Sequence, residues 1–297
     1  MVILIVEGAS LVIRFLKMTG LIFLFLAIYY VSQVLSSMIF GLAYGIRIGI
    51  ESAKTGTMEN SSNITEELTS FISGNMSLIL VLAILLSLIL YYIVFKIKKT
   101  SIKDYFLSSR ISVKNLIVIF ILGISLNITI GYILSFISEI SVLKGLFDKY
   151  DMVSKQIFGG DNFILTFLVI GLIVPVFEEI LFRGLVFGEL KKSLSKYVAL
   201  VLQAVVFGVY HMNVVQGIYA CLIGLLIGFV YLKSKSIFGA ILLHISINAT
   251  AVVFSQTHVQ NFVEKNSIFY LIISLLLSVV MLTMFVKDKQ NEKYIPI

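Results

Sequence analysis

Residues 163–177 read FILTFLVIGLIVPVF, an uncharged run that is followed directly by EEILFRG at residues 178–184. The run is typical of a helix built for lipid, since a spanning helix needs about 20 mostly apolar residues. An ionised carboxylate in hydrocarbon costs about 2.5–3.5 kcal/mol on insertion scales. Two adjacent glutamates at the end of such a run therefore need a physical reason.

Similar apolar runs recur along the 297 residues, of which 59% are hydrophobic and 13% charged. A soluble domain of this length needs more polar surface, so the composition predicts a polytopic membrane protein. The uncharged runs are 18–46, 77–95, 115–138, 162–177, 197–232, 237–254 and 268–286. At about 1.5 Å per residue, 197–232 would be about 54 Å long, against a hydrocarbon core of about 30 Å, so we expect a break near His211. The predicted fold is an all-α bundle of about eight transmembrane helices.

The charges between the runs alternate in sign from one loop to the next. Seventeen of the 23 Lys and Arg residues fall in the alternate loops that include both termini. The positive-inside tendency then predicts that the N- and C-termini are cytoplasmic. In this interpretation the basic loops face anionic lipid, and the absence of a basic folded domain argues against nucleic-acid binding. Glu178 and Glu179 are the only charges assigned to the spans themselves.

The acidic pair differs in its possible partners. Glu179 and Arg183 are four residues apart, so they share a helix face and can form an ion pair near the end of the helix. Glu178 points about 100° away from that face and is not matched by the same arginine. The ion pair is a structural explanation for Glu179, whereas Glu178 is better explained by a catalytic or transport role.

Two of the three histidines lie inside apolar runs, each with a companion at helical spacing. Phe207 precedes His211 by four residues and Asn248 follows His244 by four, so each pair shares a helix face. Polar groups in lipid need partners, and counting from the intervening turn puts Glu178 and His211 at similar depth. We therefore expect these side chains to converge, while the counting leaves open to which side the site opens.

The three-part pattern EExxxR, FxxxH and HxxxN over residues 160–255 resembles the CAAX-protease and bacteriocin-processing family of intramembrane endopeptidases, also called the type II CAAX prenyl endopeptidase or Abi family. The resemblance implies an eight-span bundle around a conical cavity open toward the cytoplasm. It implies that Glu178 activates a water held with His211, and that His244 and Asn248 donate hydrogen bonds to the carbonyl oxyanion. The residues implied to support them are Glu179, Arg183 and Phe207. Peptide hydrolysis needs such a base and such donors.

A metal is an open alternative. Glu178, His211 and His244 could ligate Zn²⁺ with one position left for water, as in a metalloendopeptidase. The chain has no HExxH pair, and a His244 that serves the oxyanion with Asn248 would leave a poor ligand set. We therefore expect a metal-free glutamate-type site without a cofactor.

The expected organisation is one integral membrane domain in three parts. Residues 1–160 would hold the first transmembrane helices with a polar loop at 47–76, 161–255 the catalytic core, and 256–297 the last helix and a cytoplasmic tail. A stripe of small residues in the core predicts close helix packing; it consists of Gly217, Cys221, Gly224 and Gly228.

Two further functions fit the same residues. One is a proton- or ion-coupled transporter that relays charge through the glutamates; the other is a catalytically silent bacteriocin-immunity or scaffold protein. Against transport, only one span carries charge and the two halves of the chain do not repeat. The expected partners are a peptide or membrane-protein substrate and membrane lipid, and the expected location is the bacterial plasma membrane. The sequence carries no signal for the oligomeric state.

Overall fold

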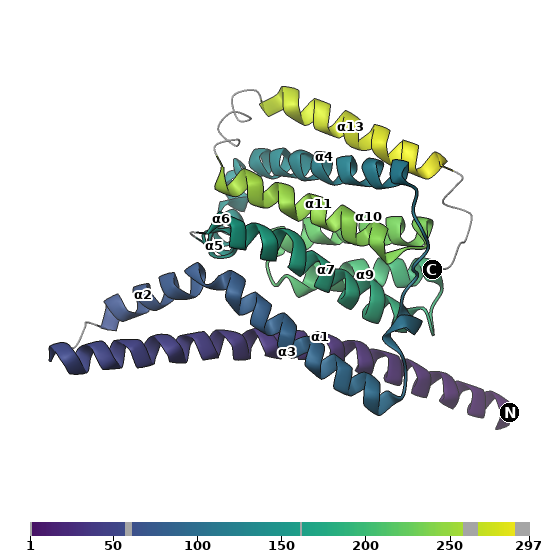
Figure 1. The fold of residues 1–297 in the computed structure, drawn as a ribbon. Coiled ribbons are helices and arrows are strands. Elements are labelled where there is room, and N and C mark those ends of the chain that lie inside the picture. The colour runs from purple at the N-terminus through teal and green to yellow at the C-terminus, as the bar shows by residue number, and fades with distance from the viewer. Residues whose placement is uncertain (1, 57–60, 161, 258–266, 289–297) are drawn as a thin grey trace.

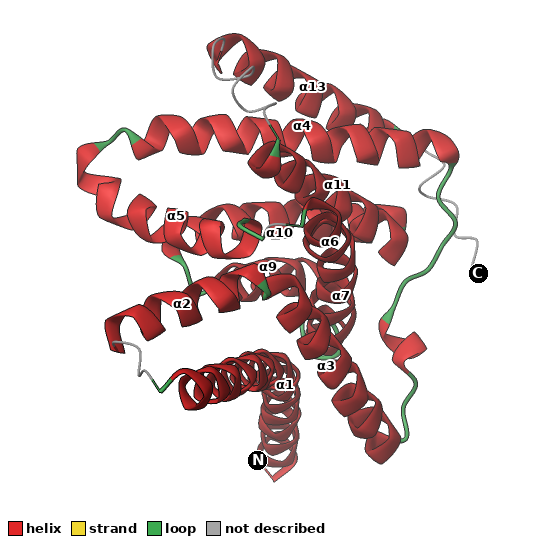
Figure 2. Cartoon of the chain, turned by 60° about the vertical axis from the view of Figure 1, so that its left-hand side comes forward, coloured by secondary structure: helices red, strands yellow, loops and turns green. Residues whose placement is uncertain are grey.

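The computed structural model describes residues 2–56, 61–160, 162–257 and 267–288, and the regular elements in these ranges are all helices (Figures 1 and 2). The N-terminal half holds α1 (Val2–Thr55), α2 (Ser61–Gly74), α3 (Met76–Lys98), η1 (Ile102–Tyr105), α4 (Val113–Ser138), η2 (Ser141–Leu143) and α5 (Lys144–Phe158). One longer helix follows, made of α6 (Phe163–Thr166), η3 (Phe167–Ile173), α7 (Val174–Glu179), η4 (Ile180–Val186) and α8 (Phe187–Leu190). The rest is α9 (Lys196–Tyr210), α10 (Val214–Ser234), α11 (Ile237–Gln256) and α13 (Ser267–Lys287).

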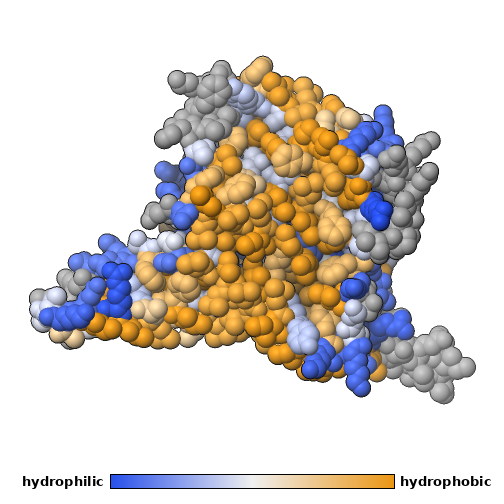
Figure 3. Space-filling view, in the orientation of Figure 1, coloured by the Kyte–Doolittle hydropathy of each residue, from blue (hydrophilic) through white to orange (hydrophobic). Residues whose placement is uncertain are grey.

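Seven of the described helices are long and apolar enough to cross a membrane. The remaining one of the eight predicted spans is α9, which has 15 residues and is shorter than the other seven. An apolar band covers the middle of the visible surface, and polar side chains gather at its two ends (Figure 3). The all-α multi-pass membrane bundle predicted from the sequence is thereby confirmed.

The predicted break in the run 197–232 is also confirmed. α9 ends at Tyr210 and α10 begins at Val214. Asn213 caps the new helix, because its side chain accepts a hydrogen bond from the backbone N–H of Gln216 at 3.0 Å. Met212 adopts a φ of 55°, which lets the chain reverse between the two helices.

The polar loop predicted at 47–76 is wrong over most of its length. α1 continues to Thr55 and α2 occupies Ser61–Gly74, while residues 57–60 lie outside the described part. The two helices are joined by a 2.8 Å hydrogen bond from the Tyr44 hydroxyl to Glu67, and Phe71 packs on the Tyr44 ring. A polar composition argues against burial in lipid, but a helix needs only one apolar face to pack.

The helix that carries the acidic pair is longer than the run 162–177 predicts. It continues to Leu190, so Glu178 and Glu179 lie within it and not at its end. Arg183 also lies inside this helix, and its exposed fraction is 0%. The predicted span ended at the first charged residue because a lone charge is costly in lipid. A charge that is paired inside a helix bundle is tolerated, so the helix itself continues.

The stripe of small residues on α10 packs against α9, as predicted. A Cβ atom added to Gly224 would lie 2.9 Å from a ring carbon of Phe207, and one added to Gly228 would lie 2.7 Å from Nε2 of Gln203. Real Cβ atoms do not approach so closely, so these glycines let the two helices and their polar side chains come into contact.

Candidate active site

Glu179 is fully buried and its Oε1 atom has two partners. Nη1 of Arg183 lies 2.7 Å away, one helical turn along the same helix, and Nδ1 of His244 on α11 also lies 2.7 Å away. A carboxylate that is paired with arginine can only accept hydrogen bonds, so Nδ1 of His244 carries its proton toward Glu179. The ion pair predicted from the sequence is present, and it includes a histidine from another helix.

Arg183 is held by groups beyond Glu179. Its Nη2 donates to the backbone carbonyl of Gly224 at 2.9 Å, and Gln203 donates to the same oxygen at 3.1 Å. The guanidinium carbon lies 4.8 Å from the ring centroid of Phe207, a cation–π contact. Arg183 therefore ties its own helix to α9 and α10, and the lack of a side chain at Gly224 makes room for it.

Glu178 has a different environment from its neighbour. Its side chain is 13% exposed and lines the central cavity, and its Oε2 lies 3.6 Å from Nε2 of His244. His244 thus lies between the two carboxylates, with Nδ1 toward Glu179 and Nε2 toward Glu178. Because Nδ1 carries a proton, Nε2 can donate a hydrogen bond only when the ring is protonated on both nitrogens.

His211 follows the last residue of α9 and lines the same cavity. Its Nδ1 lies 2.7 Å from the backbone carbonyl oxygen of Phe207, one turn earlier, and the two rings meet edge to face at 4.8 Å. A carbonyl only accepts, so Nδ1 is the donor and Nε2 of the neutral ring has a free lone pair. The FxxxH spacing therefore fixes the tautomer of His211 and leaves an acceptor for water.

Asn248 lies one turn after His244 on α11 and also lines the cavity. Its Nδ2 donates to the backbone carbonyl of Ile170 at 3.3 Å, within the π-helical segment η3. One N–H of the amide is used by that bond and the second is available. π-Helical turns occur frequently at functional sites, and here η3 and η4 flank the acidic pair on both sides.

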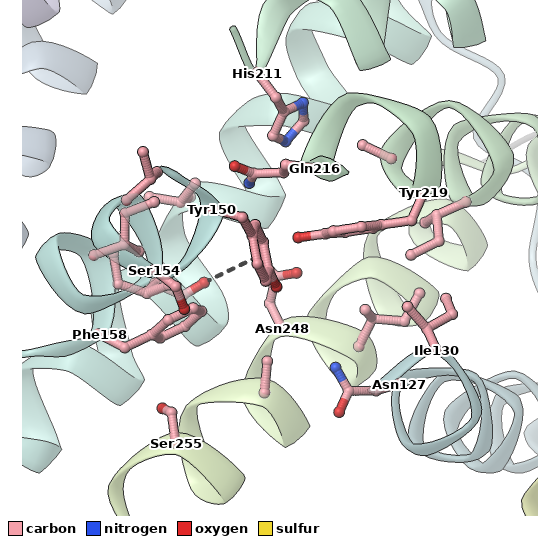
Figure 4. A pocket seen from close by; sticks show the side chains of 18 of the residues that line it. Asn127, Ile130, Tyr150, Ser154, Phe158, His211, Gln216, Tyr219, Asn248 and Ser255 are labelled. Atoms are coloured by element: carbon pink, nitrogen blue, oxygen red, sulfur yellow. Dashed lines mark hydrogen bonds between the residues drawn. The ribbon is translucent and has the colours of Figure 1, made fainter. Parts of the chain in front are cut away.

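The cavity measures about 630 Å³ and collects all four predicted catalytic residues. Its wall also holds aromatic and polar residues that the sequence patterns did not predict: Tyr29, Tyr150, Tyr210, Gln216 and Tyr219. Tyr150 and Tyr219 point toward each other across the space (Figure 4), with ring centroids 6.1 Å apart. Tyr29 and Tyr210 stack at 5.7 Å. Tyr210 could have been noticed beside His211, whereas nothing in the sequence marks Tyr29 on α1.

The wall of the cavity carries little charge. Among the described lining residues Glu178 is the one carboxylate, and none is Lys or Arg. Tyr150 lies on α5, outside the predicted spans, and burial raises the pKa of its phenol. Tyr150 therefore stays neutral near physiological pH, and the wall offers hydrogen bonds and ring faces in place of ion pairs.

The candidate zinc ligands do not form a ready metal site. Glu178, His211 and His244 line one cavity, but the described part of the chain holds no cluster of three His, Cys, Asp or Glu side chains that could hold a metal ion. Nδ1 of His244 faces Glu179, so Nε2 is the nitrogen of that ring that could face a metal ion. As placed, these residues do not fit a three-ligand zinc centre.

Residues 160–250 match the family model described as type II CAAX prenyl endopeptidase Rce1-like. The matched segment contains all three parts of the EExxxR, FxxxH and HxxxN pattern. A curated protein of Bacillus subtilis (strain 168), "Putative membrane peptidase YdiL", is 28% identical over 103 residues, which are 35% of this chain and 42% of that protein. The chain thus aligns with less than half of this relative. No solved structure matches the chain.

Proposed function

We propose that the chain is an intramembrane endopeptidase that hydrolyses a peptide bond with a water activated by Glu178. The main support for the proposal is that the two glutamates have different environments. Glu179 is buried and held by Arg183 and His244, whereas Glu178 faces the cavity. The family match over the residues that carry both carboxylates and the similarity to a protein named as a membrane peptidase support it.

The attacking water would be held by Glu178 and by the free lone pair on Nε2 of His211. The carboxylate takes a proton as the water oxygen bonds to the carbonyl carbon of the substrate. When the tetrahedral intermediate collapses, the C–N bond breaks and Glu178 returns that proton to the leaving amine. The general base and the general acid are then one side chain at successive steps.

The oxyanion would be stabilised by His244 and by the second amide N–H of Asn248. Donation from Nε2 of His244 requires the doubly protonated ring, because Nδ1 is already committed to Glu179. With that ring charged, Arg183 and His244 balance the two glutamates, and the buried set has no net charge. Such balance matters because uncompensated charge is costly inside a membrane protein.

Comparison of peptide termini in cells tests the proposal. Cells that express the wild-type chain should contain new termini that are absent from cells with Glu178→Gln, and the purified wild-type protein should cleave the same sites in proteoliposomes. The matched control is Glu66→Gln, since Glu66 is an exposed carboxylate on α2. Identical termini from wild-type and Glu178→Gln cells would reject a peptidase. Proton or ion flux through the same proteoliposomes without cleavage would favour the transporter.

A further inference from the structure

The walls of the cavity extend from the level of Glu178 toward one end of the bundle. The walls are the C-terminal half of α4, the N-terminal half of α10, α5 and the second half of α11. Ser154 on α5 and Gln216 near the start of α10 line the cavity (Figure 4), and we call the end of the bundle at which α5 lies the mouth end. Gln256, at the end of α11, donates to the carbonyl of Gly160 at 3.0 Å and ties the same end together.

The opposite end of the bundle is closed. From Glu178 toward it the helix presents Phe182, Leu185 and Phe187, with exposed fractions of 0%, 0% and 1%. The carboxylate of Glu189 then accepts hydrogen bonds from Tyr105 at 2.5 Å and from Lys192 at 2.9 Å. We call this the basic end, because the chain segments that form it are rich in lysine and arginine.

Backbone contacts join the basic segments to one another. Ser109 N donates to the carbonyl of Lys235 at 2.9 Å, and Ile237 N donates to that of Leu107 at 2.7 Å. The connection between α3 and α4 is therefore packed on the turn between α10 and α11. In Figure 1 this end lies on the right and α5 lies on the left.

The two ends differ in charge. Residues 96–114 hold six Lys and Arg against one Asp, whereas residues 139–161, at the mouth end, hold three Lys against four Asp and Glu. Residues 47–67, which include the end of α1 and the start of α2, hold four Glu against one Arg and one Lys. By the positive-inside tendency the basic end is cytoplasmic. The mouth end is then on the other side of the membrane, opposite to the cytoplasmic opening that the family resemblance implies.

We propose that the cavity opens to the extracytoplasmic side and takes an exported or outward-facing polypeptide segment that is uncharged around the scissile bond. The choice of substrate rests on the proposed function, whereas the side of the opening does not. A cationic side chain in the cavity would form an ion pair with Glu178 and would compete with the attacking water for this carboxylate. An anionic side chain would be repelled by Glu178 and would find no Lys or Arg among the described lining residues.

Cysteine labelling in oriented membrane vesicles tests the side of the opening. In a Cys221→Ser background, a membrane-impermeant maleimide should label Ser154→Cys and Gln216→Cys in right-side-out vesicles. Lys103→Cys, exposed on the basic segment, should be labelled in inside-out vesicles alone. Met152→Cys is a second reporter of the mouth end, because its side chain is 62% exposed on the outer face of α5 and does not line the cavity.

The reverse pattern would overturn the proposal, as would labelling of Met152→Cys and Lys103→Cys from the same side. Failure of both cavity positions to label from the outer side, with Met152→Cys labelled there, would overturn the opening itself. The labelling pattern should be the same when Glu178→Gln is also present. If the cysteines are labelled as expected but no peptide is cleaved, the proposed function is rejected and the orientation stands.

For the substrate class, the new termini should map to exported or outward segments without charged residues next to the cleaved bond. Termini in cytoplasmic segments, or flanked by charged residues, would overturn it.

Discussion

Nδ1 of His244 lies 2.7 Å from Oε1 of Glu179, the same oxygen atom that accepts a hydrogen bond from Arg183. This contact joins two parts of the sequence pattern, EExxxR and HxxxN, whose residues are 65 positions apart. It fixes the orientation and the tautomer of a histidine whose other nitrogen points to Glu178. One glutamate thus positions the histidine, and the other faces the cavity.

Glu178→Gln should abolish turnover while the protein stays folded. The amide has the shape of the carboxylate but cannot take a proton from water, so the rate of cleavage should fall by orders of magnitude. Glu178 is partly exposed and lies 3.6 Å from His244, so the melting temperature should fall less than it does for Glu179→Gln. Turnover and thermal unfolding of the purified protein measure the two effects. Near-normal activity would disprove the role as base.

Arg183→Ala should lower stability as well as activity. It leaves Glu179 as a buried charge without its arginine and removes one of the two donors to the Gly224 carbonyl. Breaking a buried pair by removing one partner costs about 3–5 kcal/mol. Glu179→Gln should behave in the same way, in contrast to Glu178→Gln. Wild-type unfolding temperatures and activities for both variants would show that the pair does not support the site.

Local spacing predicted those parts of the site that a single helix determines. The separation of Glu179 and Arg183 predicted their ion pair, and the length of 197–232 predicted the break at His211. The contact between Glu179 and His244 depends on how α7 and α11 pack, and sequence spacing does not encode that. Tyr29 reaches the cavity from α1 for the same reason.

The errors in the predicted fold have a common cause. Counting apolar residues locates lipid-facing surface but does not locate helix ends, because a helix continues wherever its polar side chains find partners. Arg183 pairs with Glu179, and its helix extends to Leu190. Glu67 accepts a hydrogen bond from Tyr44, and α2 forms in a segment whose polar composition predicts a loop.

Gly228→Leu should destabilise the bundle. A Cβ atom at this position would lie 2.7 Å from Nε2 of Gln203, which donates to the carbonyl that also binds Arg183. Overpacking of this kind costs about 1–3 kcal/mol, and it should displace α10 from α9. Gly45→Leu is the matched control, since nothing lies within 4 Å of its Cβ position on α1. Equal unfolding temperatures for the two variants would contradict the close packing.

Asn248→Ala should lower kcat by about 10²–10³ with a small effect on KM, the loss expected for one oxyanion donor. Asn127→Ala is the control, because Asn127 lines the same cavity from α4 but is not assigned to the oxyanion. Steady-state kinetics on a cleaved peptide distinguish the two variants. Equal losses would mean that Asn248 only shapes the cavity.

Metal analysis of active, purified protein should find well under one equivalent of zinc. A catalytic zinc ion needs three protein ligands at about 2.0–2.2 Å, and here one nitrogen of His244 is held by Glu179. Its other nitrogen would have to bind the metal and donate to the oxyanion, and one atom cannot do both. Chelators should therefore leave turnover unchanged in the wild type. Stoichiometric zinc, with activity lost on chelation and restored by zinc alone, would instead make Glu178, His211 and His244 the ligands. Glu179 would then be the carboxylate that orients a metal-bound histidine.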